Sequence, residues 1–284
     1  MILHFRFVFN SKILHFTVYY IEFRDFATKE ALLNKFALLP SLIDTNASFL
    51  NYLNNYKHKS IMSIGSVYET AYRGDFNQVK VKVDEDNALI NRPDSNQRLL
   101  IHWAALGGNK HLVDFLIDLG SPIDPLDDTN STPLILSSSA GRVDVVKLLL
   151  SKGANVNQKT NRGQSSLHYA CSKGHFEVSK LLIEYDANVN DADVLNATPL
   201  HRAAAQGRSN IVELLLASPH IKVDVCDSTG STPLHIACEE DREAVACMLV
   251  KAGANMELAN KDKKTPLELS SSPKLRNILR AIVI

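Results

Sequence analysis

The sequence is poor in the features that mark a disulfide framework, a membrane span or a nucleic-acid-binding surface. Its 284 residues include only four cysteines (Cys171, Cys226, Cys238 and Cys247), none in a Cys-x-x-Cys arrangement, so we expect mostly core thiols in a reducing compartment. After Lys12, the longest uncharged stretch of the apolar N-terminal region, Ile13 to Ile21, is far too short to span a bilayer. The 31 basic residues balance 31 acidic ones, which gives no electrostatic footprint for nucleic acid.

Signatures of common catalytic and cofactor sites are also missing. The chain contains no GxGxxG, no Walker-type phosphate loop, no GxSxG elbow and no HExxH pair. We therefore expect a protein that is not an enzyme and that needs no cofactor.

What the chain does contain is an internal repeat. Thr-Pro-Leu-His occurs intact at Thr198 and Thr232, and variants recur every 33 or 34 residues. The aligned units start at Leu99, Thr132, Ser165, Thr198, Thr232 and Thr265, with a weaker unit near Ser66. A threonine hydroxyl can cap a helix and proline suits its first turn, so each start predicts a short helix. Glycines such as Gly141 then predict its end, and an apolar stripe such as Val145 to Leu150 predicts a second helix.

The period and the motif resemble the ankyrin-repeat family over roughly residues 62–284. This resemblance implies an all-α solenoid of about seven helix-turn-helix repeats with hairpin loops and a concave binding surface. Four histidines share one position of separate repeats (His102, His168, His201 and His235). A zinc site needs converging ligands, whereas this array is linear, so we interpret the histidines as hydrogen-bonding groups between neighbouring repeats, as ankyrin repeats use them.

Residues 1–61 differ from the rest of the chain. They hold eight of the eleven phenylalanines and show no trace of the repeat. Three interpretations stay open: an additional N-terminal cap, a disordered tail, and an over-extended gene model whose true start is Met62. We therefore divide the chain into an N-terminal extension, residues 1–61, and a repeat domain, residues 62–284.

Some repeat variants resemble the gankyrin family of proteasome assembly chaperones, in particular Ile101-His102-Trp103-Ala104 and His201-Arg202-Ala203-Ala204-Ala205. The resemblance implies that the concave face holds the C-terminal domain of a proteasomal AAA ATPase subunit through basic residues. The matching positions are Arg98 and Lys173, together with Asp128; Ser131 stands where that family has a tryptophan. It also implies a location in the cytoplasm and nucleus. We expect a monomer with no nucleic-acid or membrane partner.

Two other protein partners remain open. A generic ankyrin adaptor or inhibitor, for example of a cyclin-dependent kinase, would use the same face. The segment from Ile236 to Glu240 (Ile-Ala-Cys-Glu-Glu) resembles the LxCxE sequence that links gankyrin to the retinoblastoma protein, with isoleucine in place of leucine. Ile236 and Ala237 are expected to lie at the start of the first helix of the sixth repeat and to pack against neighbouring residues. This segment could therefore extend along a partner only after local unfolding.

Overall fold

The computed structural model describes residues 3–9, 12–18 and 66–282. The chain divides into two compact units, Met1–Ile61 and Met62–Ile284. In the first unit, β1 (Leu3–Phe9) and β2 (Lys12–Val18) pair antiparallel, with Leu3 opposite Val18 and Phe9 opposite Lys12. The sequence patterns did not predict this hairpin. The hypotheses of a disordered tail and of a start at Met62 fall largely on residues outside the described ranges.

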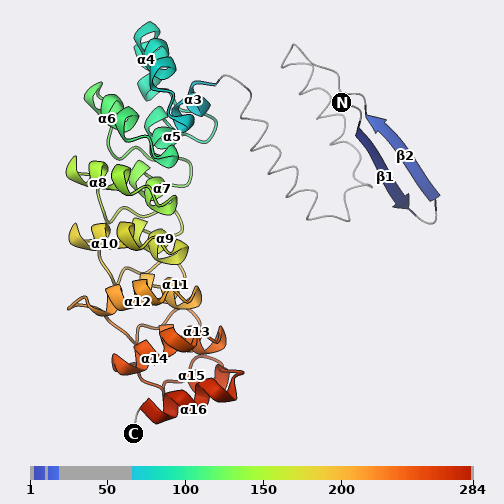
Figure 1. Cartoon of the computed structure of the whole chain (residues 1–284), viewed down its shortest axis with the longest axis vertical. Coiled ribbons are helices and arrows are strands. Elements are labelled where there is room, and N and C mark those ends of the chain that lie inside the picture. Colours follow the sequence, from blue (N-terminus) through green and yellow to red (C-terminus); the bar gives the residue numbers. More distant parts are fainter. Residues whose placement is uncertain (1–2, 10–11, 19–65, 283–284) are drawn as a thin grey trace. The chain divides into compact units, whose positions relative to one another are not determined.

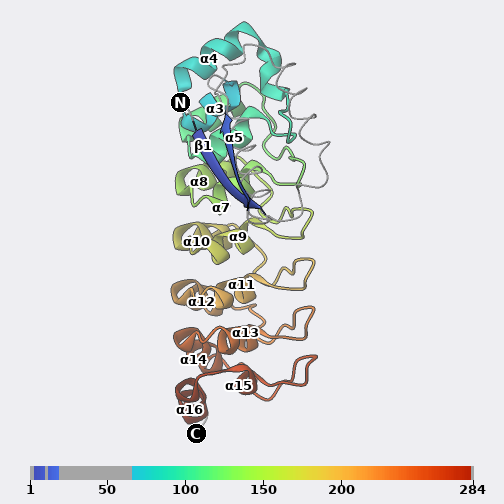
Figure 2. The ribbon, with the colours of Figure 1, turned by 90° about the vertical axis from the view of Figure 1, so that its right-hand side faces the viewer.

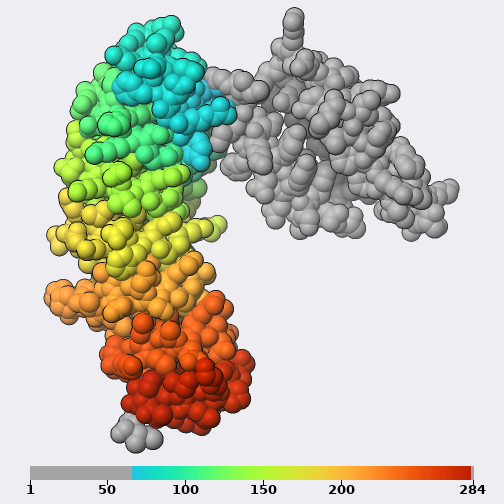
Figure 3. Space-filling model, in the orientation of Figure 1, coloured from blue at the N-terminus to red at the C-terminus, as the bar shows by residue number. Residues whose placement is uncertain are grey.

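Residues 66–282 form two rows of short helices (Figure 1). The first row consists of α3 (Val67–Arg73), α5 (Leu100–Gly107), α7 (Pro133–Ser139), α9 (Ser166–Lys173), α11 (Pro199–Ala205), α13 (Pro233–Glu239) and α15 (Pro266–Leu269). The second row consists of α4 (Phe76–Glu85), α6 (Lys110–Asp118), α8 (Val143–Ser151), α10 (Phe176–Glu184), α12 (Ser209–Leu216), α14 (Glu243–Lys251) and α16 (Pro273–Ile282). A 3-10 turn, η2 (Asn87–Asn91), follows α4. Each first-row helix packs against the next one in its row, and the repeats form a continuous stack (Figure 3). The all-helical solenoid is confirmed.

The predicted helix starts are correct. The Thr132 hydroxyl accepts a hydrogen bond from the backbone N–H of Ile135, and the Thr232 hydroxyl accepts one from His235. In both helices proline takes the first helical position, where its missing N–H leaves no intrahelical bond unmade. Local sequence therefore sets where each first helix begins.

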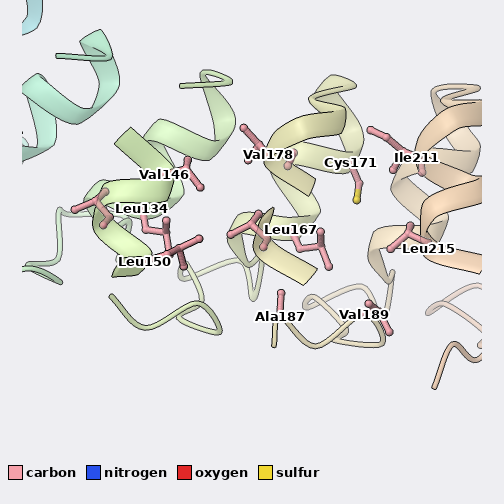
Figure 4. Packing of buried hydrophobic residues seen from close by; sticks show 14 of the residues in the cluster. Leu134, Val146, Leu150, Leu167, Cys171, Val178, Ala187, Val189, Ile211 and Leu215 are labelled. Atoms are coloured by element: carbon pink, nitrogen blue, oxygen red, sulfur yellow. The ribbon is translucent and has the colours of Figure 1, made fainter. Parts of the chain in front are cut away.

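Small and aliphatic side chains fill the space between repeats. One alanine position of the first helices is fully buried in four repeats (Ala104, Ala170, Ala203 and Ala237). Leu134, Leu167 and Val178 lie between adjacent helices (Figure 4). Apolar residues of the connecting loops pack against the same core (Ile123, Val156, Val189, Val223 and Met256). The core is thus one continuous layer shared by all the repeats.

The cysteines divide into two groups. Cys171 and Cys238 are fully buried, and burial raises the pKa of each thiol to about 12. Cys247 is partly buried, whereas Cys226 is exposed on a hairpin loop, so the core interpretation is wrong for Cys226. The two buried thiols stay protonated at neutral pH and serve as small apolar side chains.

Two aspartates occupy backbone conformations that other repeats give to glycine. Asp186 follows α10 with φ of 62°, at the position that Gly153 takes with φ of 89°. Asp241 follows α13 with φ of 53°, at the position of Gly141 with φ of 70°. A side chain in the left-handed region crowds the backbone, a cost that glycine avoids.

We expect Asp186→Gly to raise the free energy of unfolding by about 0.5–1 kcal/mol, because glycine relieves this strain. At the equivalent Gly153 an added Cβ would meet no atom within 4 Å, so the gain comes from the backbone alone. Urea unfolding measures the change. Asp186→Ala is the control, which keeps the Cβ and is expected to lower the stability. Equal midpoints for the two variants would contradict the assigned strain.

The four histidines link neighbouring repeats, as predicted. In His201, Nδ1 accepts the backbone N–H of Thr198 at 3.1 Å, and Nε2 lies 3.1 Å from the carbonyl oxygen of Ser231 in the next hairpin. The other three make the same pair of contacts, reaching the carbonyls of Ser131, Ala197 and Lys264. An imidazole that accepts at Nδ1 must donate from Nε2. Each ring is therefore neutral, and it fixes its own helix start while binding the following repeat.

This arrangement predicts a loss of stability in mild acid. Burial lowers the pKa of all four imidazoles, although the carbonyl contacts oppose part of that shift. Below about pH 6.5 the unfolded chain therefore takes up protons that the folded chain does not. The free energy of unfolding consequently decreases as the pH is lowered. Urea midpoints at pH 7.5, 6.5 and 5.5 measure the effect, which 0.5 M salt leaves largely intact because the groups are buried. A midpoint that stays constant over this range would rule out the neutral histidine array.

Candidate protein-binding face

The hairpin loops before the first helices all project to one side of the stack (Figure 2). One residue at the base of each hairpin organises its turn, and these residues share one repeat position (Asp94, Asp127, Thr160, Asp193, Asp227 and Asn260). In Asp127, Oδ1 accepts the backbone N–H groups of Thr129 at 2.9 Å and Ser131 at 2.8 Å. The other five make the same two bonds, to residues two and four positions further on. Such side-chain turns give each hairpin one defined shape.

The hairpin tips are joined to one another. We define the tip pair of a hairpin as the two residues that follow its organising residue (Ser95-Asn96, Asp128-Thr129, Asn161-Arg162, Val194-Leu195, Ser228-Thr229 and Lys261-Asp262). In the second to sixth pairs, the first residue donates its backbone N–H to the carbonyl of the second residue of the preceding pair, at 2.8 to 3.1 Å. The six hairpins thus form one hydrogen-bonded row, and the backbone positions of their tips are fixed relative to one another.

The second carboxylate oxygen of three hairpin aspartates holds a side chain of the face. Asp94 Oδ2 accepts the indole N–H of Trp103 at 2.9 Å, and Asp193 Oδ2 pairs with Arg202. Asp127 Oδ2 accepts Nε of Arg98, from the preceding hairpin, at 2.9 Å. One carboxylate thus shapes the turn and positions a functional group beside it.

Two of these aspartates remain ionised despite their burial. Burial alone would raise the pKa of Asp127, but the hydrogen bonds from Thr129, Ser131 and Arg98 outweigh it and hold the pKa below the ordinary value. In Asp193, burial is likewise outweighed by Arg202 and by two backbone N–H groups, so its pKa is also lowered. The negative charges are neutralised within the fold, and the face presents the cationic side of each pair to solvent.

A second set of face residues comes from the first helices. The fourth residue of each first-row helix from α5 to α15 is partly exposed beside the hairpins (Trp103, Leu136, Tyr169, Arg202, Ile236 and Leu269). Trp103 packs edge-on against Tyr72 with ring centroids 6.3 Å apart, and the Arg98 guanidinium lies 5.4 Å from the Trp103 centroid. The stripe is mainly apolar and aromatic, with cations beside it, a composition found in protein interfaces.

The sequence-predicted site residues fall into two places. Arg98, Asp128 and Ser131 lie in adjacent hairpins: Arg98 has a side chain 20% exposed and pairs with Asp127, whereas Asp128 is exposed at its tip. Ser131 is buried, with its hydroxyl 2.8 Å from that of Thr129, so it shapes the turn. Lys173 lies apart at the end of α9, exposed, and no ion pair to it occurs among residues 66–282.

Sequence reasoning missed Trp103 as part of this face. Ser131 stands where the resembled family has a tryptophan, but Trp103, the only tryptophan of the chain, lies on the same face and supplies an aromatic group there. A signal was available, because the fourth helical position recurs with the repeat and differs from the buried positions around it. Comparing that position across repeats would have found the stripe.

The segment resembling LxCxE lies within a helix. Ala237 and Cys238 have no exposed surface, whereas Glu239 and Glu240 are exposed at the end of α13. Two of its residues are thus core residues of the sixth repeat, and the intact fold presents only its acidic end and the partly exposed side chain of Ile236.

Within the described residues, no helix combines the length and the apolar character needed to cross a bilayer. In the same part of the chain, no three side chains of histidine, cysteine, aspartate or glutamate gather as metal ligands would.

Comparison with known families identifies the fold. The family model described as "Ankyrin repeats (3 copies)" matches residues 68–160 and 157–225, and the one described as "Ankyrin repeat" matches residues 229–261. The chain belongs to the ankyrin-repeat family. Ankyrin repeats are typically non-catalytic protein-binding scaffolds, so the chain is a protein-binding scaffold and the face described above is its candidate binding surface.

The curated ankyrin-repeat relatives include proteasome proteins. The chain is 41% identical to the 26S proteasome non-ATPase regulatory subunit 10, or gankyrin, of Mus musculus over 63 residues, which cover 22% of this chain and 27% of the mouse protein. It is also 41% identical to the Homo sapiens protein over 67 residues, covering 24% of this chain and 30% of the human one. The match thus spans less than a third of these relatives.

Solved ankyrin-repeat domains superpose on most of the chain. The human ASB11 ankyrin repeat domain has a TM-score of 0.69 at 26% identity, covering 77% of this chain and 97% of that domain. The ankyrin repeat domain of Bcl-3 has a TM-score of 0.66 at 22% identity, covering 76% and 98%, and shows the fold alone.

Proposed function

We propose that this ankyrin scaffold is an assembly chaperone of the 26S proteasome regulatory particle. Its hairpin and first-helix face would hold the C-terminal domain of a proteasomal AAA ATPase subunit in the cytoplasm and nucleus. The observation that carries the proposal is the 41% identity to non-ATPase regulatory subunit 10, together with Lys173 and Arg98, the two basic positions matched to that family.

The charges of the face support an acidic partner. Lys173 is exposed with no ion pair among the described residues, so its full charge is available. Arg98 donates Nε to Asp127 and keeps a side chain 20% exposed, so the rest of its guanidinium can meet a carboxylate. Asp128, exposed at its tip, offers an acceptor to a cation of the partner. We propose these three residues as direct contacts, and Ser131 as the residue that shapes the hairpin between them.

Lys173 provides the sharpest test. Reversal of Arg98 would also place a second carboxylate beside buried Asp127, whereas Lys173 has no ion pair to lose within residues 66–282. We expect Lys173→Glu to weaken binding to the ATPase C-terminal domain at least tenfold, equivalent to about 1.4 kcal/mol. Titration calorimetry at 50 and 300 mM salt measures the affinity, and the difference between the two proteins should shrink at the higher salt.

The matched control is Lys147→Glu, which reverses an exposed lysine on second-row helix α8 and is expected to leave the affinity unchanged. Circular dichroism checks that both variants fold. Equal affinities for Lys173→Glu and Lys147→Glu would remove Lys173 from the interface. No binding of any proteasomal ATPase domain by the unaltered chain would reject the chaperone role and favour the adaptor or kinase-inhibitor alternative.

A further inference from the structure

One hairpin tip differs from the other five in chemistry. In each of the others the tip pair is polar, but the tip between α10 and α11 carries Val194 and Leu195. Their side chains are among the most exposed large apolar groups in the described part of the chain, at 66% for Val194 and 54% for Leu195. Two adjacent apolar residues at such exposure create a small apolar surface in the middle of the hairpin row.

The backbone presents this pair rigidly. The N–H of Val194 donates to the carbonyl of Arg162 at 3.1 Å, and the carbonyl of Leu195 accepts the N–H of Ser228 at 2.8 Å. The N–H of Leu195 donates to Asp193 Oδ1 at 2.8 Å. Because these backbone groups are already bonded, a ligand would meet the two side chains and not the main chain. The backbone of the tip is thus ordered before any partner arrives, which reduces the backbone entropy lost on binding.

The charges around the tip are cationic. Arg162 is exposed on the preceding tip, and Arg202 lies partly exposed on the adjoining helix. The acidic residue that precedes the tip, Asp193, is buried and already bonded to Arg202 and to two backbone N–H groups. A complementary surface therefore carries an apolar side chain with a carboxylate beside it.

We infer that Val194, Leu195 and Arg162 form an anchoring site for the ATPase C-terminal domain, filled by a segment with an apolar side chain next to a carboxylate. This inference rests on the proposed function and adds a second contact to it. Lys173 lies at the carboxyl end of α9, whereas the tips lie beyond the amino ends of the first helices. A domain that touches both is held at two ends of the face, and its orientation is thereby fixed.

The test replaces the apolar pair by the pair that the next tip already uses. In the full chain, Val194→Ser with Leu195→Thr reproduces Ser228-Thr229, so the hairpin is expected to keep its shape. We expect the affinity for the isolated ATPase C-terminal domain to fall about tenfold at both 50 and 300 mM salt, since burial of apolar surface is insensitive to screening. Arg162→Ala should weaken binding mainly at low salt.

The matched control is Val81→Ser, which removes an apolar side chain 55% exposed on second-row helix α4 and is expected to leave the affinity unchanged. Unchanged affinity of the folded Val194→Ser, Leu195→Thr variant, with Lys173→Glu still weakened, would overturn the anchoring site and leave the proposed function standing. Absence of binding by the unaltered chain would overturn both.

Discussion

Replacing Asp127 by alanine is expected to lower the free energy of unfolding by about 3–5 kcal/mol, the range for losing one partner of a buried ion pair. The Asp127 side chain has no exposed surface, and it bonds Arg98, the backbone of Thr129 and the backbone of Ser131. Its removal leaves the N–H groups of Thr129 and of buried Ser131 without their acceptor and frees Arg98 from its position over Trp103. Urea unfolding followed by circular dichroism measures the loss.

Two variants separate the contributions. Asp128→Ala changes the next residue, which is exposed at the tip, and should alter the stability by no more than about 0.5 kcal/mol. Asp127→Asn retains an acceptor for the turn, as Asn260 does at the same position of the last hairpin, but gives up the charge that faces Arg98. We expect the stability of Asp127→Asn to lie between that of Asp127→Ala and that of Asp128→Ala. Equal stability of the two alanine variants would mean that Asp127 does not organise its hairpin.

Replacing His201 by alanine is expected to cost about 2–5 kcal/mol. The imidazole bonds the buried N–H of Thr198 and the carbonyl of Ser231, and alanine leaves both without their side-chain partner. The unpaired N–H of Thr198 costs about 1–3 kcal/mol, and the vacated volume adds a cavity term. The Ser231 carbonyl keeps the N–H of Asp227 at 2.9 Å, so its loss is smaller. Because the lost bond joins two repeats, we also expect the fifth and sixth repeats to uncouple, seen as a broader unfolding transition.

The control is His111→Ala, which removes an exposed histidine of α6 and should leave both the midpoint and the steepness of unfolding unchanged. The pH dependence gives a second readout, since the His201 variant should lose part of its sensitivity below about pH 6.5. A His201 variant as stable as the His111 variant would show that the inter-repeat bonds contribute nothing measurable.

The repeats that start near Ser66 and at Thr265 carry glutamate, not histidine, at the histidine position. The repeat that starts at Thr265 has Glu268 where four of the five internal repeats have histidine and the third has Ile135. The Glu268 carboxylate accepts hydrogen bonds from the N–H and the hydroxyl of Thr265. Glu268 therefore closes its own helix start, and among the described residues no hydrogen bond from it to a neighbouring hairpin occurs. The first repeat likewise has Glu69, which pairs with Arg73.

The binding face was harder to predict. Arg98 and Lys173 are both basic, and the sequence does not distinguish them. In the structure, Arg98 forms an ion pair with Asp127, whereas no ion pair to Lys173 occurs among the described residues. In the sequence, Ser131 follows the exposed tip residue Thr129 by only two positions, and it is nevertheless buried. These differences depend on contacts with the neighbouring hairpin, which no single repeat contains.

The sequence by itself determined the repeat period, the helix starts at threonine and proline, and the buried alanine and histidine positions, because each follows from local backbone chemistry or from recurrence at a fixed spacing. Only the tertiary structure decided which polar groups remain available to a partner. Arg98 meets Asp127 across 29 residues, and Trp103 meets Asp94 across nine. Stacking of successive hairpins creates such pairs, so the exposed charge of the face and the isolated apolar tip at Val194 and Leu195 become visible only once the repeats are packed together.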